Sequence, residues 1–233
     1  AGEKRLAGRT EQAVYERLGL AWVPPELRED RGEIDAARRD AVPELIAPGD
    51  IRGDLQSHTT ASDGRDSIRA MAEAARARGY EYLAITDHSQ RVSMAGGLDD
   101  EACLRHARRI RRVNEELDDL WLLAGIEVDV LRDGSLDLRA ETLSQLDWVL
   151  ASVHYDRDLG RARMTRRLLS AVTSGLVHGL AHPLGRMIGQ RGRMAFDTDE
   201  VFAACAEHDV AVEINAQPDR LDLPDTLCRE ARD

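Results

Sequence analysis

Five apolar runs of the sequence each end on a histidine or a carboxylate, the side chains that commonly bind metal ions in proteins. Imidazole and carboxylate ligands without thiolate suit Zn²⁺, Mn²⁺ or Fe²⁺ in open catalytic sites. Two or three such ions about 4 Å apart can hold an attacking and a leaving oxygen together, as in many phosphoesterases. The sequence therefore predicts a multinuclear, hydrolytic metal site made of residues that share this position, namely His58, Asp63, Asp87, His88, Glu127, His154 and His182.

Two of the carboxylates are expected to have special roles. Glu127 is expected to bridge two ions, because a carboxylate offers two oxygens and an imidazole cannot bridge in this way. Asp87 directly precedes His88 and is assigned to orienting a ligand. Direct ligation and a cap at the strand end stay open as alternatives for Asp87.

The remaining histidines are not expected to bind metal. His106 falls in an arginine-rich helix, where we expect it on a solvated face. His178 begins its strand, at the end opposite the chemistry. His208 ends a helix, where a positive charge suits the helix dipole.

The elements that must position these residues form a strand–helix alternation from Ile51 onward, repeating at roughly 30-residue spacing, the size of a βα unit. Such an alternation gives a parallel sheet, and an α/β barrel keeps its chemistry at the carboxyl ends of its strands. The predicted helices are 66–78, 99–117, 140–145, 162–174, 197–208 and one beginning at 223. The predicted strands are 53–58, 81–86, 121–128, 148–154, 177–182 and 210–215.

Residues 1–50 have a different character and are predicted to be a separate segment from residues 51–233. Thr10 can cap a short helix that Gly19 ends, with Val14 and Leu18 on one face. The pair Pro24-Pro25 then imposes an extended stretch, and prolines near residue 45 mark a linker. This region has too few apolar residues to fold alone.

Composition describes a globular protein of 233 residues with 42% hydrophobic and 32% charged residues. No run approaches the ~20 apolar residues that span a bilayer and no signal peptide opens the chain, so no membrane partner is expected. The three cysteines have no CxxC spacing and are expected as reduced thiols in a cytoplasmic protein. The chain begins with alanine instead of methionine, and its sequence pattern is already under way at position 1. We therefore expect a piece of a longer protein.

Charge and arginine usage bear on nucleic-acid binding. A net charge of −11 argues against a protein that binds nucleic acid over its whole surface. Nearly all basic residues are arginine, which suits bidentate phosphate contacts. Arginines follow several strand ends, where they either hold phosphates near the metals or are solvated loop charges. The residues that we assign to DNA binding are Arg91, Arg161, Arg163, Arg186 and Arg191.

Five motifs in order, DLQSHTTASDG from Asp54, TDHS at 86–89, GIEVD at 125–129, SVH at 152–154 and AHP at 181–183, resemble the PHP (polymerase and histidinol phosphatase) domain. The form is most similar to the domain at the C-terminus of bacterial family X DNA polymerases. The stretch GLAWVPPELREDRGEIDAA before it resembles the end of their polymerase domain. The resemblance implies an α/β fold, a distorted (βα)7 barrel truncated before its last strand, preceded by a short helical and extended segment.

The resemblance also implies three divalent ions, Mn²⁺ or Zn²⁺. His58, Glu127 and Gln56 would serve the first, Glu127 with His154 and His182 the second, and Asp63 with His88 the third, and the catalytic set would be Glu127, His58 and His154. Two departures matter. Gln56 stands where most PHP domains have histidine, and a neutral amide is a weaker ligand. A final Asp-x-His motif would lie beyond Asp233, so the chain is expected to fold yet be poorly metallated or inactive.

The function implied is a manganese-dependent 3′–5′ exonuclease that processes 3′ ends in DNA repair, including base excision repair. Its partners would be single-stranded and primer-template DNA and the polymerase domain of the same longer chain. Two alternatives stay open. One is a small-molecule phosphomonoesterase similar to histidinol phosphatase, against which residues 1–50 argue. The other is a degenerate PHP scaffold that stabilises a polymerase domain, which only Gln56 favours.

Overall fold

The computed structural model describes residues 7–232, which divide into two compact units at the boundary between Ile51 and Arg52. In the first unit, helix α1 (Glu11–Arg17) begins at the predicted cap, where the Thr10 hydroxyl accepts a hydrogen bond from the backbone N–H of Ala13. Gly19 follows the helix with a φ of 70°, a conformation that favours glycine. The predicted helix of residues 10–19 is therefore confirmed.

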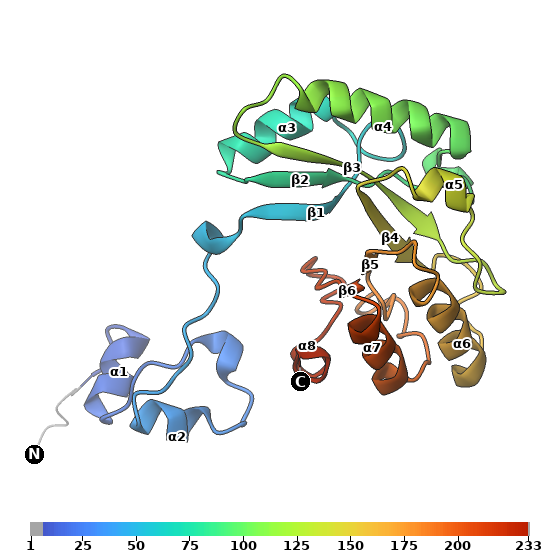
Figure 1. The fold of residues 1–233 in the computed structure, drawn as a ribbon. Coiled ribbons are helices and arrows are strands. Elements are labelled where there is room, and N and C mark those ends of the chain that lie inside the picture. Colours follow the sequence, from blue (N-terminus) through green and yellow to red (C-terminus); the bar gives the residue numbers. More distant parts are fainter. Residues whose placement is uncertain (1–6, 233) are drawn as a thin grey trace, which may run out of the picture. The chain divides into compact units, whose positions relative to one another are not determined.

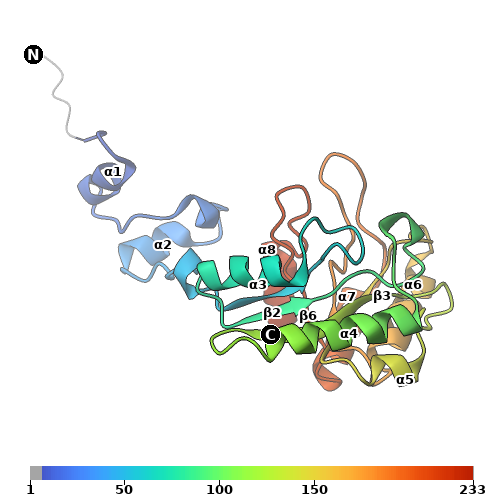
Figure 2. The same ribbon diagram turned by 90° about the horizontal axis from the view of Figure 1, so that it is seen from above.

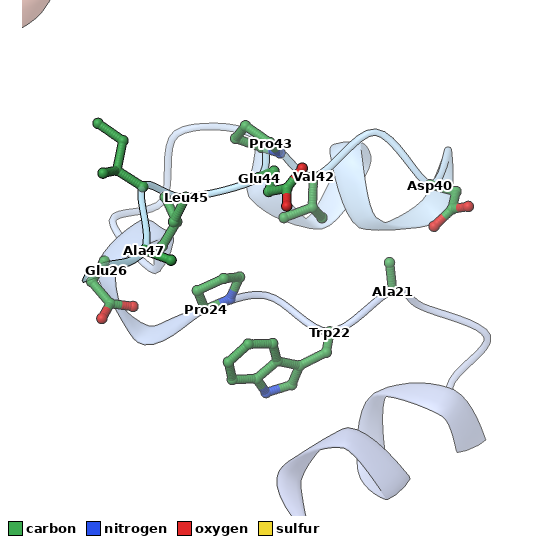
Figure 3. A pocket seen from close by; sticks show the side chains of 11 residues that line it. Ala21, Trp22, Pro24, Glu26, Asp40, Val42, Pro43, Glu44, Leu45 and Ala47 are labelled. Carbon is green, nitrogen blue, oxygen red and sulfur yellow. The ribbon is translucent and has the colours of Figure 1, made fainter. Parts of the chain in front are cut away.

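The rest of the first unit is short helical turns joined by extended chain. Helix α2 (Glu33–Arg38) is flanked by the 3-10 turns η1 (Pro25–Leu27) and η2 (Pro48–Asp50). Among the described residues of this unit, the fully buried apolar side chains are Val23 and Ala37. An open pocket of about 590 Å³ lies between the chain around Trp22 and the chain around Val42 (Figure 3). This unit therefore has a very small apolar interior.

The second unit is built on one sheet of six parallel strands in the order β1-β2-β3-β4-β5-β6. The sheet curls into a half-barrel with the helices on its outer side (Figure 1), so the predicted distorted α/β barrel fold is confirmed. Strands β5 and β6 are shorter than predicted because only two residues of each are paired along the ladder. The strands are β1 (Gly53–Ser57), β2 (Tyr82–Ile85), β3 (Trp121–Asp129), β4 (Trp148–Ser152), β5 (Gly179–Leu180) and β6 (Ala211–Val212).

The helices cover the sheet as the alternation predicts. Two of them, α3 and α4, lie side by side over the first three strands (Figure 1, Figure 2). No helix in the described part of the chain is long and apolar enough to cross a membrane. The helices are α3 (Ile68–Ala77), α4 (Asp100–Asn114), α5 (Ala140–Leu143), α6 (Arg161–Val172), α7 (Thr198–Glu207) and α8 (Asp225–Arg232), and the 3-10 turn η3 (Ser93–Ala95) precedes α4.

A continuous apolar core lies between the sheet and these helices. Ile85, Ile126 and Leu168 are among its fully buried side chains. All three cysteines are free, as predicted from their spacing, and two of them, Cys103 and Cys205, are buried in the core. Burial of these apolar side chains is the main stabilising term for the half-barrel.

Gly125 marks the point at which the sheet curls. Strand β3 pairs with β2 through Trp121–Ala124 and with β4 from Gly125 onward. A Cβ at position 125 would lie 2.7 Å from the carbonyl oxygen of Trp148, too close for any side chain. Because all six strands are parallel, their carboxyl ends lie at one rim of this curled sheet, where the candidate site lies.

Candidate metal centre

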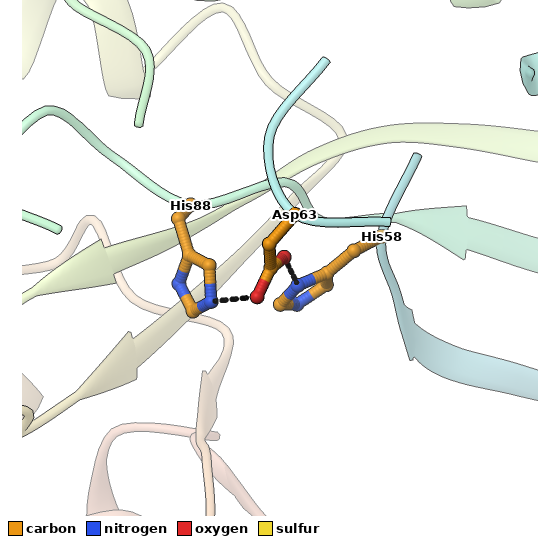
Figure 4. Close-up of side chains that lie close together, drawn as sticks. All are labelled: His58, Asp63 and His88. Atoms are coloured by element: carbon orange, nitrogen blue, oxygen red, sulfur yellow. Dashed lines mark hydrogen bonds and ion pairs between the residues drawn. The ribbon is translucent and has the colours of Figure 1, made fainter. Parts of the chain in front are cut away.

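The structure brings six of the predicted residues together at the carboxyl ends of the strands. His58 follows β1 directly, His154 and His182 each lie two residues beyond β4 and β5, and His88 pairs with Glu127 beyond the end of β2. In Figure 4 the Asp63 carboxylate lies between the imidazoles of His58 and His88. Its Oδ1 is 2.8 Å from His58 Nδ1, and its Oδ2 is 3.5 Å from His88 Nε2.

Glu127 lies at the centre of the cluster and divides it into two halves. Its Oε2 is 3.3 Å from Nε2 of His58 and 3.1 Å from Nδ1 of His88. Its Oε1 is 2.9 Å from Nε2 of His182 and 3.5 Å from Nε2 of His154. Each oxygen therefore faces a different pair of imidazoles, which is the arrangement that a bridging carboxylate needs.

The electrostatics of the centre favour cations. Burial opposes the charged form of His58, but the Glu127 and Asp63 carboxylates outweigh it and raise the pKa of His58 to about 9. Burial also opposes the charged form of Glu127, yet the hydrogen bond from His182 and the nearby imidazole of His58 hold the pKa of this buried carboxyl well below its usual range. Glu127 is therefore an ionised carboxylate inside the protein, and such a charge requires positive partners.

Two buried atoms show that the residues fit a divalent ion. His88 Nδ1 and Glu127 Oε2 face one another at 3.1 Å, and neither has a hydrogen-bond partner in residues 7–232. Burial, followed by the like charges of His58 and His154, lowers the pKa of His88, which favours the neutral imidazole that ligates metals. Two residue groups are spaced to hold an ion, one of His58, Asp63 and His88 and one of His88, Glu127 and His154.

Gln56 lies on β1, two residues before His58 in the sequence. Its Oε1 is buried without a hydrogen-bond partner among the described residues. A buried amide oxygen without a donor costs about 1–3 kcal/mol. A cation ligated by this oxygen would remove that cost, and the predicted ligand role of Gln56 stays a proposal.

Asp87 organises the loop that carries Asp63. Its fully buried carboxylate accepts hydrogen bonds from the backbone N–H groups and hydroxyls of Thr59 and Ser62, at 2.6 to 3.1 Å. The Ser62 hydroxyl also accepts from the backbone N–H of His88 at 3.3 Å. Asp87 thus ties the loop after β1 to the end of β2, which favours the orienting role over direct ligation.

The prediction for His106 is wrong. This histidine is 5% exposed on α4 rather than solvated, and its Nε2 lies 2.8 Å from Oδ2 of Asp87. Its neighbours Cys103, Ala107 and Ile110 form the buried face of α4, because residues three or four apart share one side of a helix. His106 therefore supports the metal centre from behind, through Asp87.

Replacing His106 with leucine should raise the Mn²⁺ concentration for half-maximal hydrolysis about 10-fold, because loss of a supporting hydrogen bond leaves the ligands less well oriented. Isothermal titration with Mn²⁺ should show the same loss of affinity. The matched control is His208→Leu at the exposed end of α7, which should leave both values unchanged. Wild-type values for the His106 variant would show that Asp87 needs no such support.

Two further acidic residues at the centre were not predicted. Asp129 is fully buried two residues after Glu127, and its Oδ1 lies 3.1 Å from Nδ1 of His154. This contact turns Nε2 of His154 toward Glu127. Glu213 accepts a hydrogen bond from the backbone N–H of His182, and burial raises the pKa of its carboxyl. The spacing of Asp129 and Glu127 on one strand was a usable signal, whereas Glu213 offered none.

Comparison with known proteins identifies the family. Residues 54–217 match the PHP domain family, and this range contains every residue of the candidate metal centre and the curled sheet except for Gly53. The chain belongs to the PHP domain family. Residues 1–29 match the DNA polymerase beta thumb. Both matches agree with the resemblance that the motifs carry, and PHP domains are metal-dependent, which agrees with the histidine and carboxylate groups at this rim.

The curated relatives fall into two groups. The DNA polymerase/3′-5′ exonuclease PolX of Bacillus subtilis is 41% identical over 214 residues, which are 92% of this chain and 37% of that protein. A probable phosphatase of Photobacterium profundum is 31% identical over 70% of this chain and 63% of its own length. One of Shewanella sp. (strain MR-4) is 32% identical over 70% and 61%. The chain thus spans little more than a third of PolX and less than two thirds of these phosphatases.

The arginines assigned to DNA binding do not all have free guanidinium groups in this PHP domain. Arg91 forms ion pairs with Asp129 and Asp156, both at 3.1 Å, and lies over the ring of Tyr155. Arg186 donates hydrogen bonds to the carbonyls of Arg220 and Leu221. These two residues hold neighbouring structure in place, and a contact with DNA would be an additional role.

Arg161 and Arg163 begin α6 and are exposed, as is Arg191 in the loop after β5. Arg161 forms a surface ion pair with Asp197 and remains 66% exposed, so its guanidinium is accessible to a ligand. Arg191 donates a hydrogen bond from Nε to the carbonyl of Gly185. Contact of these three exposed arginines with a nucleic-acid strand stays a proposal.

Proposed function

We propose that this chain is a metal-dependent phosphoesterase that removes nucleotides from DNA 3′ ends, as a 3′–5′ exonuclease attached to a family X DNA polymerase. The observation that carries the proposal is the buried Glu127 carboxylate with two imidazoles on each oxygen, in a PHP chain whose first residues match a polymerase thumb. The identity of 41% with PolX, an exonuclease by name, supports DNA rather than a small molecule as the substrate.

Three divalent ions, Mn²⁺ or Zn²⁺, are proposed as cofactors. His58 and Glu127 with Gln56 would hold one ion, Glu127 with His154 and His182 a second, and Asp63 with His88 a third. Bound ions would supply Lewis acidity to a phosphoryl group and activate water for attack. Nitrogen and carboxylate donors without thiolate suit both metals.

The chain's own residues position this chemistry. The proposed catalytic residues are Glu127, His58 and His154, whose side chains converge on one point at the rim. Asp129 accepts the Nδ1–H of His154 and so fixes which ring nitrogen faces the site. Asp87 keeps the Asp63 loop folded against the end of β2. The arginines of the strand-end loops would hold the phosphates of the DNA strand in place.

The partners and setting of this function are also proposals. Single-stranded and primer-template 3′ ends would be the DNA substrates, and the polymerase domain of the same longer chain would supply or receive them. Removal of 3′ nucleotides beside a polymerase suits DNA repair in the cytoplasm of a bacterium, including base excision repair. The thumb match at residues 1–29 supports the polymerase partner.

A small-molecule phosphomonoesterase is the second candidate, because the probable phosphatases match 70% of this chain. Arg161 separates the two functions. Arg161→Gln should flatten the salt dependence of DNA binding by about one unit of slope, because one phosphate contact is lost. It should raise the DNA concentration for half-maximal rate and leave hydrolysis of a chromogenic phosphodiester intact.

The control for Arg161 is Arg109→Gln, which removes an exposed arginine from the outer face of α4. Binding isotherms at several salt concentrations measure the slope for both variants. An equal loss of hydrolysis rate on both substrates would show that Arg161 takes part in the hydrolysis step. If neither substrate is affected, Arg161 is a solvated surface residue without a role in binding. Arg91→Gln should impair both substrates, because its ion pair with Asp129 supports His154.

Gln56 should make one ion weakly bound, because an amide oxygen is neutral and a poorer ligand than imidazole for these metals. Gln56→His should therefore lower the metal concentration for half-maximal activity about 10-fold. Activity measured against total Mn²⁺ and Zn²⁺ gives this value. An unchanged or increased requirement would show that Gln56 does not ligate metal.

A further inference from the structure

Three arginines that come from different loops meet at the carboxyl-end rim, outside the metal centre. Arg157 follows β4, Arg191 follows β5 and Arg220 follows β6. The carbonyl oxygen of Gly185 accepts hydrogen bonds from both Nη2 of Arg157 and Nε of Arg191, the latter at 3.1 Å. Two guanidinium groups therefore share one acceptor.

The positive charges of the three groups act on one another. Burial, followed by the charges of Arg191 and Arg220, lowers the pKa of Arg157 to about 10. Burial and the charge of Arg220 lower the pKa of Arg191 in the same direction. Burial and the neighbouring positive charges both disfavour the charged guanidinium groups, so a negatively charged ligand would stabilise the cluster.

Several N–H groups of the cluster have no acceptor among the described residues. Nε and Nη1 of Arg157 and Nη1 of Arg220 are buried, and none of them has a hydrogen-bond partner within residues 7–232. Asp222 is the acidic group that favours the charged form of Arg157, but its oxygens accept the backbone N–H groups of Leu184 and Gly185 at 3.2 and 2.7 Å. A buried N–H group without an acceptor is destabilising, so an added acceptor would be favourable here.

The surrounding backbone holds the cluster in place. Gly185 has a φ of 57°, a conformation that favours glycine, and a Cβ there would lie 2.7 Å from Nη2 of Arg157, so the guanidinium packs closely against this backbone. Arg186 bonds to the carbonyl of Arg220 at 2.8 Å, and Met187 and Arg191 close a short turn with two backbone hydrogen bonds. The loop of residues 186–193 lines a hollow of about 530 Å³.

We propose that Arg157, Arg191 and Arg220 form a binding site for a phosphate group. A tetrahedral oxyanion offers several oxygens to guanidinium N–H donors, which bind phosphate in bidentate fashion. Gly185 follows His182 by three residues, so the segment that carries a proposed metal ligand also carries this site. On the proposed function, the phosphate would belong either to the backbone of the DNA strand or to a released mononucleotide.

The test measures phosphate binding by the full-length protein in excess chelator, so that no metal contributes. The probes are inorganic phosphate, thymidine monophosphate and a short single-stranded oligothymidylate, each titrated at constant ionic strength. All three should bind to the wild type. Arg191→Gln and Arg220→Gln should each weaken the phosphate affinity about 10- to 100-fold, since each removes a charged hydrogen bond. Arg191 is exposed, so its variant should fold normally, and Arg109→Gln is the control.

The three probes identify the source of the phosphate. If the variants lose affinity only for the oligothymidylate and inorganic phosphate, the site binds the DNA backbone. If they lose affinity equally for thymidine monophosphate, the site binds the released nucleotide. Wild-type affinities in both variants, or no phosphate binding by the wild type, would overturn the proposal. The proposed function fails separately, because a protein that binds phosphate here but does not degrade DNA with Mn²⁺ would contradict the nuclease alone.

Discussion

Glu127→Gln should abolish Mn²⁺-dependent hydrolysis of DNA, with a fall in rate of about 10³-fold or more. The change keeps the volume of the side chain but removes the negative charge that faces four imidazoles. Loss of a bridging ligand should release at least one ion, and transition-state stabilisation by a metal is worth several kcal/mol. Metal analysis of the purified variant should show fewer bound ions than in the wild type.

The control is Glu101→Gln, which changes an exposed glutamate on α4 by the same chemistry. Circular dichroism should show that both variants keep the fold. Near-wild-type DNA degradation by Glu127→Gln, with unchanged metal content, would contradict the bridging role.

Arg167→Met should lower the free energy of unfolding by about 3–5 kcal/mol. Arg167 is 1% exposed and is among the largest fully buried side chains, and its guanidinium donates to four backbone carbonyls. These carbonyls belong to the loops after β3 and β4, which follow Asp129 and His154. Methionine fills the space of the aliphatic stem but leaves the acceptors without donors. For a domain of this size the melting temperature should fall by about 10 °C.

Arg166→Met is the matched control, because the neighbouring side chain on α6 is exposed. Its stability should stay within about 0.5 kcal/mol of the wild type. Thermal and urea unfolding of the metal-free proteins measure both variants. A melting temperature for Arg167→Met that matches the control would show that water satisfies the four carbonyls.

The strand ends could be predicted because polar residues interrupt apolar runs at regular spacing. His58, His88 and His154 follow β1, β2 and β4, where the curled sheet brings them within reach of Glu127. The order and parallel direction of the strands also followed from the alternation. The lengths of β5 and β6 did not, because an apolar run does not reveal how many of its residues pair.

His106 was misplaced because its arginine neighbours suggested a solvated helix face. The spacing of Cys103, Ala107 and Ile110 was the better signal, since it puts His106 on the buried side of α4. Arginines after the strand ends could be seen in the sequence, but the grouping of Arg157, Arg191 and Arg220 could not, because their loops are brought together only by the fold. The residue types and their spacing indicate which side chains can bind a ligand, but the contacts from distant loops that complete a site follow only from the fold.

The most direct test is digestion of 5′-labelled single-stranded DNA by the full-length protein, with and without Mn²⁺. We predict a ladder of products shortened from the 3′ end that requires the metal, is lost with chelator and returns when Mn²⁺ is restored. Glu127→Gln should give no ladder under the same conditions. Intact DNA at all Mn²⁺ concentrations, while a small phosphomonoester is hydrolysed by the same preparation, would contradict the nuclease and favour the small-molecule phosphatase.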